Sequence, residues 1–507
     1  MRHAHSVEKV RAAEAELMAR LPEGALMQRA AAGLASVCAR LLGRLYGTRV
    51  LLLVGGGNNG GDALYAGARL ARRGARVTAA LASPRIHEEG LADLRAAGGR
   101  VLSFALLEEL LSTDGGAVGT FAGTDLVIDG LTGIGGRGAL RGLYAPLVRD
   151  LPEDAAVVAC DVPSGVDADT GEVEGEAVRA DVTVTFGTFK PGLLIDPGAS
   201  YAGVVELVDI GLDLPEPDVI AHTTADVRLP RPLPESDKYR RGVVGVLAGS
   251  SEFTGAAVLA VGGALHGGAG MVRFASSEPV VELVRGRWPE AVTTSLPSDA
   301  QSLEPVGRVQ AWVVGPGLSV DSRAHRLVHA ALESDVPVLV DADGLNVLAG
   351  MSEPLRRGLL DRAAPTVLTP HAGELARLLG ADRSDIEARR LAHVRRAADE
   401  LGATVLLKGS TTLVAAPGAH PVLANLTGTP WLATAGTGDV LSGLIGALLA
   451  AGLPAPEAAA HGAHLHGLAA RLAAAPDPAL SPAPVTAFDV LTSLPAALRR
   501  LPAPASP

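Results

Sequence analysis

The chain has 507 residues, enough for two to four domains of roughly 100–200 residues each. Apolar residues make up 48% and charged residues 20%, so large hydrophobic cores can form and wholesale disorder is excluded. The formal net charge of -11 disfavours binding to a polyphosphate backbone, and the aromatic content of 3% disfavours a base-stacking platform. The composition therefore indicates a folded enzyme and argues against a nucleic-acid-binding protein.

The cysteines and the apolar runs indicate the compartment. Cys38 and Cys160 are too few for a disulfide framework, which favours a reducing environment. The first residues are polar and helical in pattern, without the apolar core of a signal peptide. The apolar run at residues 440–453 is shorter than the roughly 20 residues that span a bilayer. We therefore expect a soluble cytoplasmic protein with no membrane partner.

Short β-rich runs alternate with Ala-, Leu- and Arg-rich helical stretches along almost the whole chain, which predicts an α/β fold with mainly parallel sheets. A first series of strands is predicted at residues 50–54, 76–81, 125–129, 156–161, 181–186 and 204–209. A second series is predicted at residues 243–247, 271–275, 312–315, 337–341, 365–368 and 404–408, followed by a hairpin-like segment. Between them, residues 211–237 are rich in proline and acidic residues, which predicts a linker.

Lysine is rare and occurs only at Lys9, Lys190, Lys238 and Lys408. All the other positions among the 44 lysines and arginines are arginine. A position that keeps lysine in such a chain favours a compact ammonium group over a guanidinium fork. Because the last three lysines lie in glycine-rich or turn-like segments, they are candidate functional residues.

The first predicted strand leads into a loop with the sequence GGGNNGGDA at residues 55–63. Glycines allow backbone amides to approach an anion at the start of a helix. Asn58 and Asn59 interrupt the GxGxxG spacing of a dinucleotide fingerprint and add carbonyl oxygens that suit a hydroxyl, an amide or an alkali cation. Turns alone explain many glycine-rich loops, but paired asparagines followed by Asp62 indicate a binding site.

Further polar residues follow three other predicted strands of the first domain. Asp129 precedes a second glycine-rich loop, Asp161 precedes a turn that carries Ser164, and Lys190 lies in TFGTFKPGL. Because ligands bind outside the carboxyl ends of strands in doubly wound sheets, we expect these segments to meet in one crevice. The alternative for each aspartate is a helix N-cap or an Asx turn.

The segments GGGNNGGDA, DGLTGIGGRG, DVPSGVDADTG and TFGTFKPGL, in this order, resemble the NAD(P)H-hydrate epimerase family over about residues 7–213. The resemblance implies a Rossmann-like fold and a nicotinamide substrate damaged by hydration at C6 of its reduced ring. It also implies a potassium ion at Asn59, Asp129 and Ser164, whose oxygen atoms suit an alkali cation. Asp161 and Lys190 are candidate catalytic residues, and the proton donor stays open between them. The implied substrate-binding residues are Asn58, Asn59, Gly60, Gly61, Asp62, Gly133, Ile134, Gly135, Gly136, Arg137, Gly138, Ala139 and Asp161.

In the second domain, the segment ATAGTGDVLSG places Gly436, Thr437, Gly438 and Asp439 at the start of an apolar helix. Amides at a helix start can stabilise a transferring phosphoryl group, and a carboxylate there can accept the proton of an attacking hydroxyl. The alternative is an aspartate that only caps the helix. This GTGD resembles the anion hole and catalytic base of ribokinase-like kinases.

The segment VLTPHAGELARLLG resembles the TPN-x-x-E motif of small-molecule kinases, with His371 in place of asparagine. Together with GTGD, KGSTT, VVGPGLS and the glycine-rich start of the domain, it resembles ADP-dependent NAD(P)H-hydrate dehydratase, a ribokinase-like family, over about residues 236–501. The resemblance implies Mg²⁺ and ADP or ATP as co-substrate. The implied contacts with the hydrated cofactor are Ala256, Gly317, His371 and Asp439. The implied contacts with the nucleotide are Lys408, Gly409, Ser410, Thr411, Thr412 and Gly438.

Three positions keep alternatives open. The segment VDADGLNVL offers Asp341 and neighbouring polar residues, for which a metal site and a turn or capping role are equally open. Ala63 and Ala435 stand where the two families usually have glycine, which leaves the exact loop path open at both places.

The two resemblances together imply a bifunctional cofactor-repair enzyme that epimerises the R and S forms of hydrated NADH and NADPH and dehydrates the S form. Residues 1–213 form a Rossmann-like three-layer domain, residues 214–235 a linker, and residues 236–507 a ribokinase-like three-layer α/β/α domain. The alternative enzyme is a ribokinase-like small-molecule kinase with a regulatory Rossmann-like domain. A third interpretation makes the first domain a scaffold. We expect a homo-oligomer whose partners are the hydrated cofactor and an adenine nucleotide, with no nucleic acid.

Overall fold

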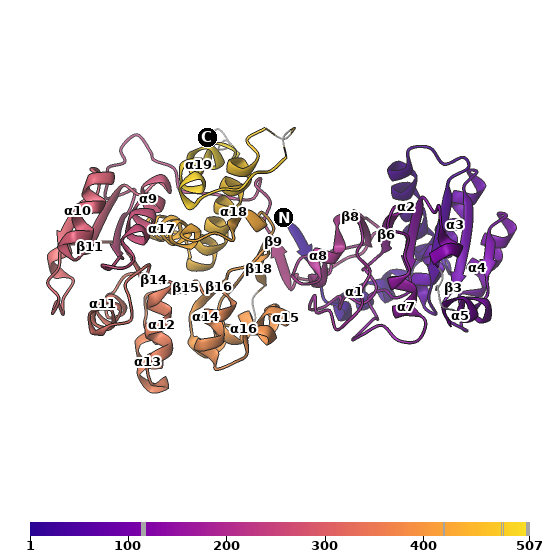
Figure 1. Ribbon diagram of the computed structural model, residues 1–507, viewed down its shortest axis with the longest axis horizontal. Helices are drawn as coiled ribbons and strands as arrows, with labels where there is room; N and C mark the ends of the chain where they lie inside the picture. The colour runs from indigo at the N-terminus through magenta and orange to yellow at the C-terminus, as the bar shows by residue number, and fades with distance from the viewer. Residues whose placement is uncertain (113–117, 419–420, 478, 480, 503–507) are drawn as a thin grey trace. The chain divides into compact units, whose positions relative to one another are not determined.

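The computed structural model describes residues 1–112, 118–418, 421–477, 479 and 481–502, which form two compact units (Figure 1). The N-terminal unit consists of residues 3–219, and the C-terminal unit of residues 220–507 together with the first two residues. The boundary falls within the short strand β9 (Val219–Ala221), and β1 (Arg2–Ala4) spans it as well. The segment predicted as a linker is therefore divided between the two units.

The N-terminal unit is built on seven parallel strands in the order β4-β3-β2-β5-β6-β7-β8. All six strands predicted for this region are present, and β4 is an addition. The order reverses between β2 and β5, and such a switch point is where ligands bind in doubly wound sheets. The strands are β2 (Arg49–Val54), β3 (Arg76–Leu81), β4 (Arg100–Leu102), β5 (Leu126–Gly130), β6 (Ala156–Cys160), β7 (Val182–Phe186) and β8 (Val204–Val208).

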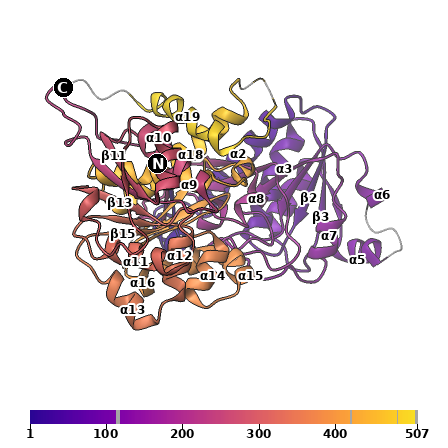
Figure 2. The ribbon, with the colours of Figure 1, turned by 60° about the vertical axis from the view of Figure 1, so that its left-hand side comes forward.

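Figure 2 shows β2 and β3 with α3 and α7 beside them, and alternate side chains of this sheet pack in two separate cores. Leu52 packs in a core with α2 (Ala25–Leu42), α3 (Asn58–Arg72) and α4 (Glu88–Ala96). Its neighbour Leu53 packs on the other face, in a core with residues of three further helices. These helices are α5 (Phe104–Ser112), α6 (Val118–Phe121) and α7 (Tyr144–Arg149). The other helices of the unit are α1 (Val7–Met18), η1 (Pro191–Leu193) and α8 (Ala199–Ala202).

The sheet of the C-terminal unit runs in the order β18-β17-β16-β15-β14-β13-β10-β11-β12, and the boundary strands β9 and β1 follow β18. Strands β10 to β16 pair in parallel, whereas β17 pairs antiparallel with both β16 and β18, and the β16–β17 pair confirms the predicted hairpin. The order reverses between β10 and β13. The strands are β10 (Val243–Leu247), β11 (Met271–Ser276), β12 (Val292–Ser295), β13 (Ala311–Val314), β14 (Val338–Val340), β15 (Thr366–Leu368), β16 (Thr404–Leu407), β17 (Thr412–Ala415) and β18 (Val422–Asn425).

Helices cover both faces of this sheet, which makes the predicted three layers (Figure 1). The main core includes α9 (Thr254–His266), α10 (Glu278–Arg287), α17 (Thr437–Ala450), α18 (Ala455–Ala474) and α19 (Ala487–Arg499). Helices α9 and α17 pack closely: a Cβ at Gly443 would lie only 2.0 Å from the Ala260 carbonyl oxygen, so the contact depends on this glycine. The remaining helices are η2 (Glu304–Val306), α11 (Ser322–Leu332), α12 (Asp343–Gly350), α13 (Glu353–Leu360), α14 (Ala372–Leu379), α15 (Arg383–Ala388), α16 (Arg390–Leu401) and η3 (Pro430–Leu432).

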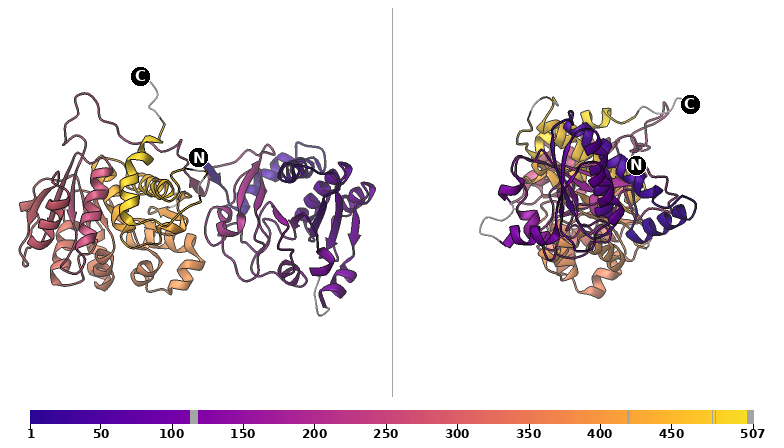
Figure 3. Two further views of the ribbon diagram at one scale, coloured as in Figure 1. Left: turned by 45° about the horizontal axis from the view of Figure 1, so that its top comes forward. Right: turned by 90° about the vertical axis from the view of Figure 1, so that its right-hand side faces the viewer.

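Three smaller features complete the description. The amino group of Met1 pairs with Asp226 at 2.7 Å, so the start of the chain is held in the C-terminal unit (Figure 3). Cys38 and Cys160 are buried and free, as expected. Among the described residues, no helix combines the length and the apolar character needed to cross a membrane.

Candidate active sites

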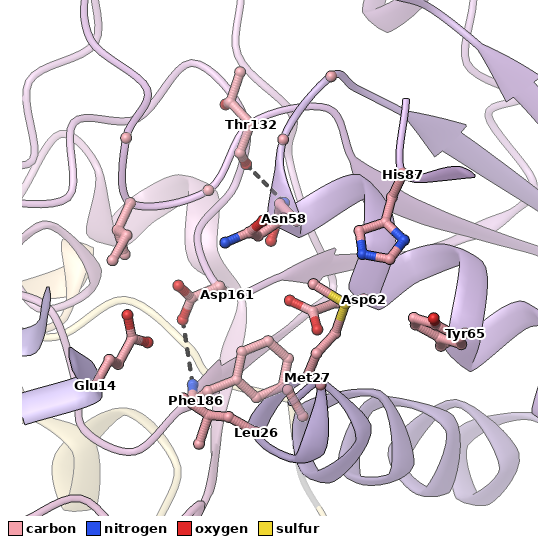
Figure 4. A pocket seen from close by; sticks show the side chains of 18 of the residues that line it. Glu14, Leu26, Met27, Asn58, Asp62, Tyr65, His87, Thr132, Asp161 and Phe186 are labelled. Atoms are coloured by element: carbon pink, nitrogen blue, oxygen red, sulfur yellow. Dashed lines mark hydrogen bonds between the residues drawn. The ribbon is translucent and has the colours of Figure 1, made fainter. Parts of the chain in front are cut away.

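The first candidate site is a cavity of about 1310 Å³ at the carboxyl ends of β2, β5 and β6 (Figure 4). It lies at the switch point of the sheet and exceeds the roughly 300–1,000 Å³ of typical ligand pockets. An adjoining cavity of about 610 Å³ shares part of its wall and is lined by Arg137, Gly138 and Ala139. The predicted substrate-binding residues that line the larger cavity are Asn58, Asn59, Asp62, Gly133, Ile134, Gly135, Gly136 and Asp161.

Helix α3 begins at Asn58, so both asparagines lie in its first turn and not in a preceding loop as the glycines had suggested. Close packing outweighs the low helix propensity of glycine here. A Cβ at Gly60 would lie 2.4 Å from the Gly55 carbonyl oxygen, and one at Gly61 would lie 3.0 Å from the His87 ring. These two glycines do not line the cavity. They allow the first turn of α3 to pack closely against Gly55 and His87.

The three residues predicted to bind potassium meet beside the loop that follows β5. The carboxylate of Asp129 accepts hydrogen bonds from the Ser164 amide at 2.8 Å and from its hydroxyl at 2.7 Å. The side chain of Asn59 donates to the Thr132 carbonyl at 2.9 Å, and the Thr132 amide donates to the Ser164 hydroxyl at 2.9 Å. Burial raises the pKa of Asp129 to about 6, against the effect of these hydrogen bonds. A buried oxygen-rich cluster with this unfavourable charge suits a bound cation.

Asp161 and Lys190 form a buried ion pair behind the cavity wall. The Lys190 ammonium lies 2.5 Å from Asp161 Oδ1 and also donates to the Thr185 hydroxyl at 3.0 Å and to the Phe186 carbonyl at 2.9 Å. Asp161 has a φ of 66°, a left-handed conformation that is unusual for a residue with a side chain and is found at functional sites. Only Asp161 of this pair lines the cavity, because Lys190 is 1% exposed. The geometry makes Lys190 a positioning residue for Asp161.

Asp62 and Glu14 are two of the four other acidic residues that line the same cavity (Figure 4). Burial and the neighbouring charges of Asp161 and Glu14 raise the pKa of Asp62 well above its usual range. Burial and Asp161 also raise the pKa of Glu14, which Lys190 and Arg11 counteract. Sequence reasoning missed Glu14, since a single glutamate in an amphipathic helix carries no distinguishing signal.

The second candidate site lies at the start of α17. Gly436, with a φ of 89°, is the N-cap residue, and α17 begins at Thr437. Asp439 therefore lies inside the first turn and is not the cap that the alternative interpretation required. Burial, followed by the charge of Asp341, raises the pKa of Asp439 to about 7, and Lys408 partly opposes this shift. A carboxyl group tuned to this range is suited to general-base chemistry near neutral pH.

Lys408 lies among acidic side chains next to Asp439. Its ammonium donates to Asp341 Oδ1 at 2.8 Å and lies 3.7 Å from Glu374 Oε2. The hydroxyl of Ser442, on α17, donates to Asp341 Oδ2 at 2.6 Å. Burial lowers the pKa of Lys408, but Asp341 and Glu374 outweigh burial, so that the pKa is raised overall. Asp341 is thus a polar anchor for both Lys408 and α17.

Of the other residues predicted to contact the nucleotide, Gly409, Ser410 and Thr411 lie in the turn after β16, Thr412 begins β17, and Gly438 lies in the first turn of α17. The guanidinium of Arg390, on α16, donates to the carbonyl oxygens of Lys408 and Thr411, each at 3.1 Å. A Cβ at Gly409 would lie 2.3 Å from Arg390 Nη2, so a larger residue there would displace the guanidinium. A Cβ at Gly438 would lie 3.5 Å from Lys408 Nζ, which places the turn beside the start of α17. Sequence reasoning missed Arg390, since one arginine among many carries no signal.

The residues predicted to contact the hydrated cofactor in this unit lie on different elements. A Cβ at Gly317, after β13, would lie 2.8 Å from the Cβ of Ala256 on α9, so these two positions are neighbours. His371 is the N-cap of α14, and its Nδ1 accepts the Gly373 amide at 3.0 Å. In return, Glu374 accepts the His371 amide at 2.8 Å. The described contacts of His371 are therefore those of a capping box.

Comparisons with known proteins agree with this division. A family model described as NAD(P)H-hydrate dehydratase matches residues 244–492, and one described as YjeF-related protein N-terminus matches residues 23–192. The bifunctional NAD(P)H-hydrate repair enzyme Nnr of Mycobacterium leprae is 48% identical, with 99% of this chain and 100% of the relative covered. The Nnr of Mycobacterium tuberculosis strain H37Rv is 50% identical, with 91% and 92% covered. A solved ADP/ATP-dependent NAD(P)H-hydrate dehydratase from Bacillus subtilis, co-crystallized with ATP/Mg²⁺, is 32% identical with a TM-score of 0.48, over 54% of this chain and 95% of that one. The chain belongs to the family of bifunctional NAD(P)H-hydrate repair enzymes.

Proposed function

We propose that the N-terminal unit interconverts the R and S epimers of hydrated NADH and NADPH, and that the C-terminal unit dehydrates the S epimer at the expense of ADP or ATP. The observation that carries this proposal is the pairing of two separate sites. One is a large cavity with an acid cluster at the switch point of a Rossmann-type sheet. The other is Asp439, a carboxyl group with a pKa of about 7 beside Lys408. One site supplies the epimer that the other consumes.

In the dehydratase site, Asp439 accepts the proton of the C6 hydroxyl as that oxygen attacks the terminal phosphoryl group of the nucleotide. The amides at the start of α17 stabilise the negative charge of the transferring group. The phosphate then leaves with the C6–O electron pair, a proton is lost from C5, and the dihydropyridine ring is restored. Phosphorylation makes this elimination feasible because phosphate is a far better leaving group than hydroxide.

Lys408 and the Lys408–Thr412 turn would hold the nucleotide phosphates. Among the described residues, Lys408 donates a hydrogen bond to one acid, Asp341, so its remaining protons can bind a phosphate oxygen. Asp341 and Glu374, which lie beside Lys408, would supply carboxylate oxygens to a nucleotide-bound Mg²⁺ whose other ligands are phosphate oxygens and water. Bound there, Mg²⁺ would neutralise phosphate charge.

In the epimerase site, Asn59, Asp129 and Ser164 would hold potassium. The buried carboxylate of Asp129, whose pKa is raised to about 6, gains a compensating charge when the cation binds. The ion would fix the loops after β5 and β6 and so shape the floor of the cavity. Gly133 to Ala139 would then follow the backbone of the dinucleotide.

The direct test is incubation of the full chain with hydrated NADH and either ADP or ATP, followed by recovery of dihydropyridine absorbance. We expect recovery with at least one nucleotide and none without it. The rival function is a small-molecule kinase with a stable product and a regulatory N-terminal unit. It predicts nucleotide consumption with a lasting phosphate ester and no recovery of absorbance.

A further inference from the structure

Five acidic side chains line the large cavity of the N-terminal unit, and three of them act on one another's charge and reach the cavity from three different elements (Figure 4). Glu14 comes from α1, Asp62 from α3 and Asp161 from the end of β6. The nearest ammonium group, that of Lys190, is already committed to Asp161, to the Thr185 hydroxyl and to the Phe186 carbonyl. Lys190 is therefore paired with Asp161, and within the described part of the chain neither Glu14 nor Asp62 forms a salt bridge.

The surroundings distinguish Asp62 from Glu14. Both Lys190 and Arg11 act on Glu14 with attractive charge. The charged groups that act on Asp62 are Asp161 and Glu14, both of which repel a second negative charge. Asp62 Oδ1 is also buried and has no hydrogen-bond partner within the part of the chain that the structure describes. A carboxylate oxygen left in this condition is costly, whereas a neutral carboxylic acid tolerates it.

We propose that Asp62 is the catalytic acid of the epimerase, the group that delivers a proton to the C6 hydroxyl of the hydrated ring. This inference rests on the proposed epimerase function of the cavity. It assigns the proton donor to a residue that the sequence marked only as a contact of the substrate. It also removes Lys190 from that role, because its ammonium is enclosed by three acceptors behind the cavity wall.

The proton of Asp62 moves to the C6 hydroxyl oxygen, and the C6–O bond breaks so that its electron pair leaves on water. The lone pair of the ring nitrogen forms a C6=N1 double bond, and the ring becomes positively charged. Water then adds to the opposite face of C6, the C6=N1 electron pair returns to nitrogen, and the proton of that water returns to Asp62. No atom is gained or lost, and only the configuration at C6 changes.

Asp161, paired with Lys190, has a defined part in this sequence. A carboxylate in the same cavity stabilises the positive charge that develops on the ring. Lys190 holds the Asp161 side chain in place through their hydrogen bond. An acid and a fixed carboxylate in one cavity would together promote acid-catalysed loss of a hydroxyl.

The test uses the full-length chain, the pure R epimer of hydrated NADH and no nucleotide. Asp62→Asn should lower kcat for conversion of R to S by about 100- to 10,000-fold and leave KM little changed. The matched control is Asp93→Asn on α4, which removes a carboxylate that pairs with Arg72 of α3 outside the cavity. Asp93→Asn should epimerise like the wild type. Wild-type epimerisation by Asp62→Asn, in a chain that still dehydrates the S epimer, would overturn the proposal.

A second measurement needs no variant. In water enriched in ¹⁸O, the wild-type chain should place solvent oxygen at C6 at the rate of epimerisation, because every turnover breaks the C6–O bond. Epimerisation without oxygen exchange would overturn the proposed chemistry of Asp62. If the wild type does not accelerate R-to-S conversion above the rate without enzyme, the proposed epimerase function itself fails.

Discussion

Each candidate site contains a lysine–aspartate ion pair, and the two sites differ in how exposed the lysine side chain is. In each, a lysine pairs with an aspartate that follows a central strand, Lys190 with Asp161 and Lys408 with Asp341. The Lys190 side chain is 1% exposed, whereas that of Lys408 is 22% exposed. An enclosed ammonium can only fix its partner, but a partly exposed one can also bind an incoming phosphate.

The two sites also differ in the pKa of the acidic residue that we propose for catalysis. In the N-terminal unit, the pKa of Asp62 is raised well above its usual range, so this residue suits the donation of a proton. In the C-terminal unit, the pKa of Asp439 is raised to about 7, so this residue suits the acceptance of a proton near neutral pH. We therefore propose that two aspartates take opposite roles because their environments differ.

The largest expected effect is that of Asp439→Asn, which keeps the shape of the side chain but cannot accept a proton. Dehydration of the S epimer should fall by about 100- to 10,000-fold, while nucleotide binding and epimerisation persist. Single-turnover recovery of dihydropyridine absorbance measures the first quantity, and R-to-S conversion without nucleotide measures the last. Full dehydratase turnover in this variant would reduce Asp439 to a structural residue.

The enclosed lysine should matter more for stability than the exposed one. Lys190→Met leaves Asp161 buried without its partner, which we expect to destabilise the N-terminal unit by about 3–5 kcal/mol. Hydrogen exchange of peptides that cover β6 and β7 measures this loss. The matched variant, Lys408→Met, should destabilise the C-terminal unit less and weaken nucleotide binding. Equal destabilisation by the two variants would contradict the distinction between the lysines.

Potassium should stabilise only the N-terminal unit. At 100 times its dissociation constant, a ligand bound only to the folded state adds about 2.7 kcal/mol to the free energy of unfolding. We expect KCl, compared with choline chloride at equal ionic strength, to protect β5 against hydrogen exchange, and Asp129→Asn to abolish this protection. The fluorescence of Trp288, Trp312 and Trp431 serves as the control, since every tryptophan lies in the C-terminal unit. Protection that persists in Asp129→Asn would place the ion elsewhere.

The pH profile of the dehydratase gives the smallest effect. A general base works only when deprotonated, and the pKa of Asp439 is about 7. We expect kcat/KM for the S epimer to be constant well above pH 7 and to fall about tenfold for each pH unit below it. A profile without a break between pH 6 and 8 would mean that Asp439 is not the base.

Much of the fold follows from the sequence, because buried parallel strands are apolar runs and their ends carry glycine and aspartate. All twelve predicted strands are present. The short strands β1, β4, β9, β12 and β18 were missed, since three or four residues are too few to show a clear apolar pattern. The start of α3 at Asn58 was also missed, because glycine next to asparagine predicts a loop when tertiary packing is unknown.

The sites were only partly predictable. Asp129, Asp161 and Asp439 stand beside glycine-rich segments, which marks them in the sequence. Glu14 and Arg390 come from ordinary helices, and only the folded chain brings them to the sites. The distinction between Lys190 and Lys408 also depends on burial, which two lysines in similar strand-end motifs do not reveal.

The most direct test of two separate sites with opposite proton chemistry is a complementation assay. Asp62→Asn and Asp439→Asn chains are each incubated with the pure R epimer of hydrated NADH and a nucleotide, first separately and then mixed, while dihydropyridine absorbance is followed. We predict that Asp439→Asn forms the S epimer without recovering absorbance and that Asp62→Asn recovers it only as fast as R and S interconvert without enzyme. The mixture should recover absorbance rapidly. If the mixture is no faster than the Asp62→Asn chain alone, the assignment of the two reactions to two independent sites is wrong.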